Sequence, residues 1–149
     1  MLFRSRGISG AVHTKSDADG VDQTLKAMDE IDRGLIFTNL VDFDTLYGHR
    51  NDVAGYAANL EWLDTRIPEI LGRMREDDVF LLTADHGCDP SDVSTDHTRE
   101  NVPLLVRGAR VRPGRALGVR ATFADLGATL ADNFGIGPLA EGTSLLSDL

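Results

Sequence analysis

The fold of this 149-residue chain is organised around one stretch, Leu81-Leu82-Thr83-Ala84-Asp85-His86-Gly87-Cys88-Asp89-Pro90. Residues 79–82 lead into it as an aliphatic and β-branched run, which predicts a buried strand because polar residues bound it. Asp85 and His86 follow the end of that strand. Open α/β folds place their sites at the carboxyl ends of parallel strands, so we expect this pair at such an edge.

A second group of polar side chains follows another apolar run, residues 35–41, which is apolar on both faces and predicts an interior strand. Divalent ions such as Mn²⁺, Mg²⁺ and Zn²⁺ accept mixed carboxylate and imidazole ligands. Each histidine taken alone is as easily explained by a surface or capping role. Taken together, five side chains on three loops favour a dinuclear metal site: Asp44, His49, Asp85, His86 and His97.

Composition limits the partners of the chain. The hydrophobic share of 42% and charged share of 26% are those of an ordinary globular protein. A net charge of −9 argues against nucleic acid and against an anionic membrane, since both require a basic surface. The single cysteine, Cys88, cannot form an internal disulfide, and residues 1–6 lack the apolar core of a signal peptide. We therefore expect a cytoplasmic location.

The remaining pattern alternates strands with helices, which predicts one α/β segment over residues 1–149 with a partly parallel sheet flanked by helices. Asp52 is expected to cap the longest helix, and Pro68 to kink or divide it. The predicted strands are residues 7–13, 35–41, 79–82 and 102–106, and the predicted helices are 21–31, 53–74 and 123–134.

Several motifs in this order resemble the alkaline phosphatase superfamily. They are Leu82-Thr83-Ala84-Asp85-His86-Gly87, then Asp96-His97-Thr98-Arg99-Glu100 and Val102-Pro103. Within that superfamily the chain is similar to the phosphopentomutases, through His13-Thr14-Lys15-Ser16, Asp22-Gln23, Thr38-Asn39-Leu40-Val41-Asp42-Phe43-Asp44 and Tyr47-Gly48-His49-Arg50.

The resemblance implies a division of the ligands between two ions, most typically Mn²⁺. Asp44, His49 and His97 would hold one ion, and Asp85 and His86 the second. Asp42 is a candidate to orient these ligands without touching the metal; so is Lys15, for which a plain surface lysine is the favoured interpretation. Phosphopentomutases interconvert the 1-phosphates and 5-phosphates of ribose and deoxyribose through a phosphorylated threonine, so the implied substrate is a pentose phosphate.

The resemblance covers only the C-terminal part of that family. The family's nucleophilic threonine, the N-terminal half of its core and its cap domain have no counterpart here, so no catalytic residue is assigned and the chain alone is expected to be inactive. Self-association or pairing with a separate N-terminal half is expected in consequence. The alternatives are another enzyme of the superfamily, such as cofactor-independent phosphoglycerate mutase, or a metal-binding fragment without catalysis.

Overall fold

The computed structural model describes residues 7–149, which contain both helices and strands and form an α/β chain. The chain divides into two compact units. Unit 1 consists of Met1–Arg73 and Cys88–Thr98, and unit 2 of Met74–Gly87 and Arg99–Leu149. The expectation of a single segment over residues 1–149 stays a prediction. The expected absence of a signal peptide falls on residues 1–6, which lie outside the described residues.

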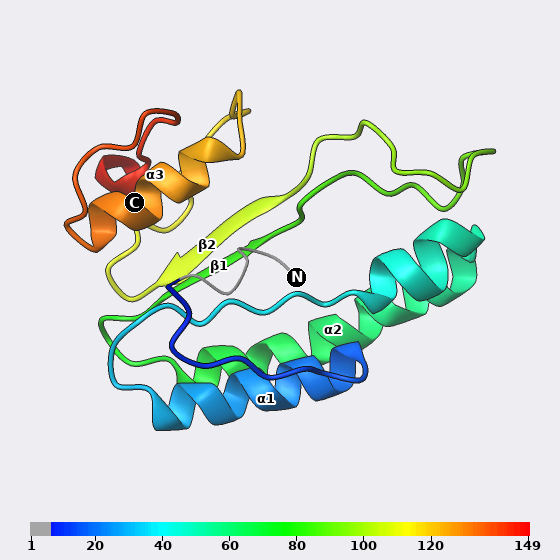
Figure 1. The fold of residues 1–149 in the computed structure, drawn as a ribbon, viewed down its shortest axis with the longest axis horizontal. Coiled ribbons are helices and arrows are strands. Elements are labelled where there is room, and N and C mark those ends of the chain that lie inside the picture. The colour runs from blue at the N-terminus through cyan, green and yellow to red at the C-terminus, as the bar shows by residue number, and fades with distance from the viewer. Residues whose placement is uncertain (1–6) are drawn as a thin grey trace. The chain divides into compact units, whose positions relative to one another are not determined.

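Unit 1 is built on two helices, α1 (Asp17–Glu30) and α2 (Val53–Arg73), which pack along each other (Figure 1). Helix α1 begins four residues earlier than the apolar pattern predicts, because the Ser16 hydroxyl accepts the Asp19 backbone N–H and caps it. The apolar face of the pair is buried at Val21, Leu25 and Ile70. Burial of that face, rather than helix propensity, holds the two helices in place.

Helix α2 begins where the sequence predicts. The Asp52 carboxylate accepts the Gly55 N–H at 2.9 Å, so Asp52 is the N-cap, as expected. Pro68 lies inside the helix without dividing it. A proline removes one backbone hydrogen bond and disfavours the helix locally, but the buried Ile70 beyond it secures the final turn against the core.

Two short helical turns join α1 to α2: η2 (Phe43–Tyr47), which is π-helical, and η3 (Gly48–Arg50), a 3₁₀ turn. Asn51 ends η3 with a backbone φ of 52°, the left-handed conformation that asparagine tolerates better than most residues. These turns carry two of the predicted ligands, Asp44 and His49.

Unit 2 holds the sheet, which consists of β1 (Val79–Thr83) and β2 (Leu104–Gly108). The strands pair antiparallel, with Val79 opposite Gly108 and Thr83 opposite Leu104. Both match predicted strands, although β2 begins two residues later than the pattern suggests.

The strands expected at residues 7–13 and 35–41 are wrong for this structure: both segments are irregular. A strand exists only through ladder hydrogen bonds to a neighbour, and within residues 7–149 neither segment has a ladder partner. Apolar side chains of the second segment consequently stay exposed, Phe37 at 62% and Leu35 at 55%.

The C-terminal part of unit 2 packs around α3 (Ala124–Asn133), which confirms the predicted final helix. Gly135 ends it with φ of 66°, and the N–H groups of Gly135 and Ile136 return to the carbonyls of Asp132 and Ala131. This pair of bonds is a Schellman motif, which requires the left-handed conformation that glycine adopts without strain. The tail, with its short turn η4 (Leu146–Asp148), folds back so that Leu145 is only 2% exposed.

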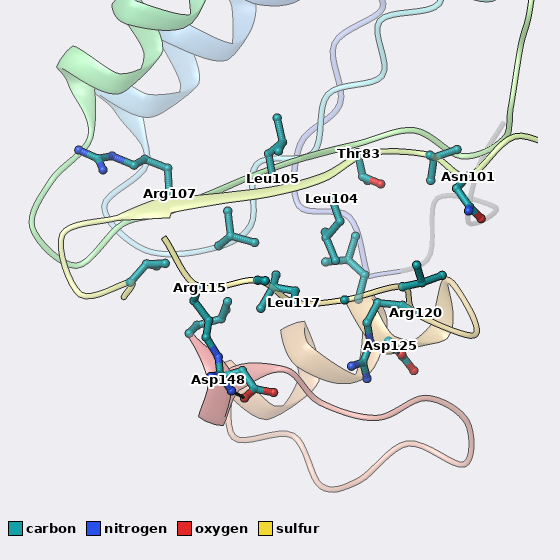
Figure 2. A pocket seen from close by; sticks show the side chains of 18 of the residues that line it. Thr83, Asn101, Leu104, Leu105, Arg107, Arg115, Leu117, Arg120, Asp125 and Asp148 are labelled. Atoms are coloured by element: carbon teal, nitrogen blue, oxygen red, sulfur yellow. Dashed lines mark hydrogen bonds and ion pairs between the residues drawn. The ribbon is translucent and has the colours of Figure 1, made fainter. Parts of the chain in front are cut away.

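A cavity of about 700 Å³ lies between β2, the segment 111–122 and the start of α3 (Figure 2). Leu104 points from β2 toward the segment that carries Leu117, whereas Arg107 points to the opposite side of the strand. Two ion pairs fasten the wall of the cavity, Arg120 to Asp125 at 2.9 Å and Arg115 to Asp148 at 2.7 Å. These contacts hold the C-terminal segment on unit 2.

Candidate metal centre

Asp44 is supplied by the π-helical turn η2 of unit 1. The turn is fastened at its start by the Thr45 N–H, which donates to the Val41 carbonyl at 2.9 Å. At its end the Gly48 N–H donates to the carbonyls of Asp44 and Phe43. The Asp44 carboxylate is therefore presented from a backbone that is hydrogen-bonded on both sides, and its side chain is only 29% exposed.

His49 lies on the next turn, η3, with its Nε2 atom 3.3 Å from Oδ1 of Asp44. Its other nitrogen, Nδ1, lies 2.5 Å from the backbone carbonyl of Thr95. A carbonyl only accepts hydrogen bonds, so Nδ1 carries a proton and Nε2 is the ring nitrogen that can ligate a metal. Metal-ligating histidines are oriented by this kind of contact to a backbone carbonyl.

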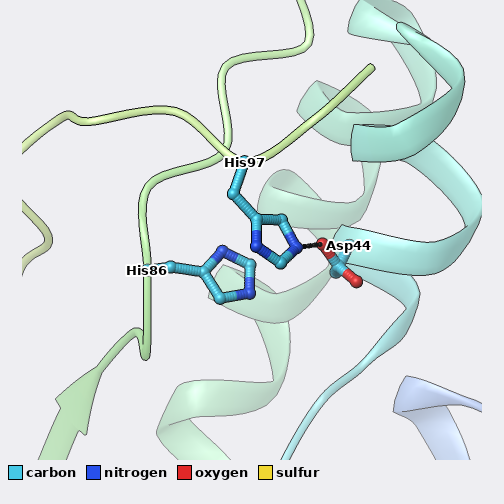
Figure 3. A group of neighbouring side chains, drawn as sticks. All are labelled: Asp44, His86 and His97. Atoms are coloured by element: carbon cyan, nitrogen blue, oxygen red, sulfur yellow. Dashed lines mark ion pairs between the residues drawn. The ribbon is translucent and has the colours of Figure 1, made fainter.

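His97 comes from the loop of residues 88–98 and reaches the same carboxylate. Its Nε2 atom lies 3.2 Å from Asp44 Oδ1, and Figure 3 shows the ring facing Asp44 across that ion pair. The rings of His49 and His97 are 4.9 Å apart between centroids and tilted by 32°. Unit 1 thus brings together three side chains that stand up to 53 residues apart in the sequence, counted from Asp44 to His97 (97 minus 44).

The distance from each histidine Nε2 to the Asp44 oxygen suits two ligands of one divalent cation. Two ligand atoms at about 2.0–2.1 Å from a tetrahedral ion lie roughly 3.3–3.4 Å apart, and around an octahedral ion roughly 3 Å apart. The two measured separations from Asp44 Oδ1, 3.2 and 3.3 Å, fall between these values. One carboxylate oxygen and two imidazole nitrogens are donors that divalent ions accept, so the residues present fit a metal ion.

Asp85 and His86 belong to unit 2 and follow β1 directly. The His86 Nε2 atom lies 3.5 Å from Asp85 Oδ1, and His86 Nδ1 lies 3.1 Å from the Gly87 carbonyl. By the argument used for His49, that carbonyl favours the tautomer whose Nε2 lone pair is available to a metal. The Asp85 side chain is 71% exposed, so it is held much less firmly than Asp44.

Asp42 lies next to the ligand turn and fastens it to helix α1. Its carboxylate accepts the Asp17 N–H at 2.8 Å, and its own N–H donates to Asp17 Oδ1 at 2.9 Å. Asp42 therefore positions the backbone from which Asp44 projects. Lys15 is exposed, and its backbone N–H donates to the Asp19 carboxylate, which matches a surface lysine.

Two residues near the site are not among the candidate site residues that the sequence predicts. Asp17 is only 2% exposed and lies in the first turn of α1, before the start at residue 21 that the sequence predicts. Burial raises the pKa of its carboxyl above 3.8, against the lowering effect of the hydrogen bonds from Asp42 and Asn59. Tyr56, whose ring meets Phe43 edge-on at 5.3 Å, also has a raised pKa, chiefly through burial and then through Cys88 and Asp44. The serine at position 16 before an acidic turn was the one available signal for the earlier helix start.

Comparison with known proteins places the chain in a family. A sequence profile described as the metalloenzyme superfamily matches residues 4–138. The chain belongs to that superfamily. Its name implies the use of metal ions, in agreement with the donor set of unit 1.

Individual relatives are similar over nearly the whole chain. The chain is 53% identical to the phosphopentomutase of Caldanaerobacter subterraneus subsp. tengcongensis over 148 residues. It is 55% identical, over the same length, to the phosphopentomutases of Kosmotoga olearia and Acetivibrio thermocellus. Each alignment covers 99% of this chain but only 38% of the relative, so the chain spans well under half the length of the proteins it matches.

The helices give no sign of a membrane span. Within residues 7–149, none is at once long enough and apolar enough to cross a bilayer.

Proposed function

We propose that this chain is the metal-binding C-terminal portion of a phosphopentomutase. The reaction of the whole enzyme is the interconversion of the 1-phosphates and 5-phosphates of ribose and deoxyribose, with a phosphorylated threonine as intermediate. That threonine belongs to the part of the family that this chain does not match. The residues 1–149 act, in this proposal, as one metal-binding segment that is inactive alone.

The observation that carries the proposal is the convergence of Asp44, His49 and His97 in unit 1, in a chain 53–55% identical to phosphopentomutases over 148 residues. Identity alone would be equally high for a fragment that had lost its site. Here both histidines present Nε2 to one Asp44 oxygen, at 3.3 and 3.2 Å, separations that ligands of a common ion have.

The proposed roles of the residues follow from their contacts. Asp44, His49 and His97 hold one divalent ion, most typically Mn²⁺, and the Thr95 carbonyl keeps His49 in the ligating tautomer. Asp85 and His86 contribute to a second ion. Asp42 holds the backbone of η2 in place through Asp17. A bound ion supplies positive charge that stabilises the transferring phosphoryl group, the main source of rate in such reactions.

The pentose phosphate and the second half of the enzyme are the proposed partners. The exposed apolar side chains of residues 35–41, among them Leu35, Phe37 and Val41, support pairing with further strands. In that assembly the sheet would extend beyond β1 and β2 and become partly parallel. Self-association of the chain is the competing outcome, and the protein is proposed to act in the cytoplasm without nucleic acid or membrane.

The experiment that tests the function is an exchange of segments. The 149-residue chain replaces the matching 38% of the phosphopentomutase from Caldanaerobacter subterraneus, and conversion of ribose 1-phosphate to ribose 5-phosphate is measured with Mn²⁺. We expect the isolated chain to be inactive and the chimera to be active. The chimera with His97→Ala is expected to lose activity, because its first ion would keep only two protein ligands.

Two results would contradict the proposal. A chimera that folds, as judged by a sharp thermal transition, but shows no mutase activity would remove the assignment to this enzyme. Full activity of the His97→Ala chimera would remove the metal role of the cluster. His13→Ala serves as the matched control, since His13 is exposed and is the one histidine outside the predicted ligand set.

A further inference from the structure

The two segments that carry the ligands of unit 1 meet at an unusually close contact between Gly48 and Cys88. Gly48 joins the turn with Asp44 to the turn with His49. It is buried, and its φ of −62° is one that any residue adopts. Glycine is therefore not required here by backbone conformation.

Space is what requires glycine at this position. A Cβ atom built on Gly48 would lie 2.2 Å from the Cys88 sulfur and 3.0 Å from the Phe43 carbonyl oxygen. The first distance is far inside van der Waals contact, and close approach of two segments is one of the few demands that only glycine meets. The Cys88 thiol thus sits directly on the backbone between the two ligand turns.

Cys88 opens the loop that supplies the third ligand. The Asp89 N–H donates to the Thr98 hydroxyl at 2.9 Å, which draws the two ends of the loop together. Within that loop lie His97, which reaches Asp44, and Thr95, whose carbonyl holds the His49 ring. A change in the distance between Cys88 and Gly48 would move both His97 and the Thr95 carbonyl relative to the Asp44 carboxylate.

We propose that Gly48 and Cys88 are positioning residues of the metal centre: the thiol seated on the glycine sets the separation between the Asp44–His49 turns and the loop that carries His97. Neither residue needs to touch the ion. The inference rests on the proposed metal site, and it assigns to Cys88 a role in packing and geometry, not in nucleophilic chemistry.

The test is a double-substitution cycle read out by calorimetric titration of Mn²⁺ into the full 149-residue chain. Gly48→Ala should weaken binding about 10–100-fold, the range found when residues that orient metal ligands are lost. Cys88→Ala alone removes the support of the loop without adding a clash and should weaken binding measurably, but by less than about 10-fold. In the double variant Gly48→Ala/Cys88→Ala the sulfur is gone and the Cβ–Cβ distance of 3.8 Å is ordinary contact. The Mn²⁺ affinity of the double variant should therefore lie within about 3-fold of that of Cys88→Ala, instead of showing the 10–100-fold loss expected for Gly48→Ala.

The control for the glycine change is Gly72→Ala in helix α2, where a Cβ meets nothing within 4 Å. It should leave Mn²⁺ affinity unchanged. Thermal unfolding is measured for all variants, so that weaker Mn²⁺ binding can be distinguished from a loss of folding. In the double variant the Mn²⁺ affinity, and not only the stability, must recover.

The outcomes are distinct. Undiminished Mn²⁺ binding by Gly48→Ala overturns the inference, since the contact would then not determine the spacing of the candidate ligands. Equally weak binding by Gly48→Ala and by the double variant also overturns it, because the Phe43 carbonyl and not the thiol would be responsible. No Mn²⁺ binding by the unsubstituted chain overturns the proposed metal site itself, and the positioning role with it.

Discussion

The two units of this chain hold their candidate ligands in different ways. In unit 1 the candidate ligands come from three separate turns and are fixed by contacts between loops, with the half-buried Asp44 as their common contact. In unit 2 the candidates are the consecutive residues Asp85 and His86, and the carboxylate is 71% exposed. Adjacency in sequence brings two donors near each other but leaves the Asp85 carboxylate exposed, whereas loop packing orients donors from distant positions.

In both units the buried core is formed by residues other than the candidate ligands. Unit 2 encloses Leu145, Ala128 and Ala131 around α3, and its tail is tied down by buried polar contacts such as the Leu145 N–H to the Thr129 hydroxyl at 2.9 Å. The candidate site of unit 1 lies outside the core formed by Val21, Leu25 and Ile70. Metal affinity and folding stability should therefore respond to different substitutions in the two units.

The largest expected effect is on metal binding by unit 1. His97→Ala removes one of three ligands and should reduce Mn²⁺ affinity by more than ~100-fold, beyond the loss typical of residues that only orient ligands. Calorimetric titration measures it, with His13→Ala as the control that keeps wild-type affinity. Retention of tight binding in His97→Ala would mean that the three side chains are not a ligand set.

The next effect is on the stability of unit 2. Leu145→Ala truncates a side chain that is 2% exposed and leaves a cavity, so it should lower the free energy of unfolding by about 2–4 kcal/mol. Urea unfolding followed by circular dichroism gives the value. Leu139→Ala, at a leucine 47% exposed in the same unit, should cost well under about 1 kcal/mol. Equal losses for the two leucines would show that the tail does not form part of a core.

A smaller effect is expected at the start of α2 in unit 1. Asp52→Ala removes the acceptor of the Gly55 N–H and should cost about 1 kcal/mol of stability, whereas Asp52→Asn retains an acceptor and should cost less. Asp64→Ala, at an exposed position within the same helix, is the control and should be close to neutral. A cost at Asp64 as large as at Asp52 would argue against the cap.

The smallest effect concerns two buried aspartates that begin helices, Asp17 in α1 and Asp125 in α3. Burial raises the pKa of Asp17 above 3.8, so its contribution is present below that pH and is lost as pH rises through the folded-state pKa. Hydrogen bonds from the Thr143 N–H and from Arg120 lower the pKa of Asp125, so its contribution is present above pH 3.8 and is lost as pH falls.

Urea unfolding between about pH 3 and pH 6, spanning the ordinary aspartate pKa, tests these opposite signs. Relative to the unsubstituted chain, Asp17→Asn should lose less stability as pH rises through this window. Asp125→Asn should gain less. The same direction of change in both variants would show that the surroundings of the two carboxyls do not differ as described.

Much of the local structure was accessible from sequence because it depends on neighbouring residues. Asp52 was expected to cap α2, since its side chain reaches an N–H three residues on. The end of α3 at Gly135 followed from the need for a left-handed residue. The strand at β1 followed from its uninterrupted apolar run. The earlier start of α1 was missed because its cap needed both Ser16 and the distant Asp42.

Strands were less predictable because a strand depends on its partner. Residues 35–41 have the composition of an interior strand, but without a ladder neighbour among the described residues they remain irregular. Residues 104–108 have a comparable pattern and do form β2, because β1 lies in register beside them. The difference lies in the available hydrogen-bond partners and not in the side chains.

The sequence by itself determined which side chains are able to hold a metal, because ligand chemistry resides in residue type. Asp44, His49 and His97 could be named from it, and so could the resemblance that links them. Only the tertiary structure decided that the Thr95 carbonyl selects the His49 tautomer and that Cys88 rests on Gly48. Such contacts join residues about 40 to 46 positions apart, and their distances are set by packing, which no local pattern in the chain encodes.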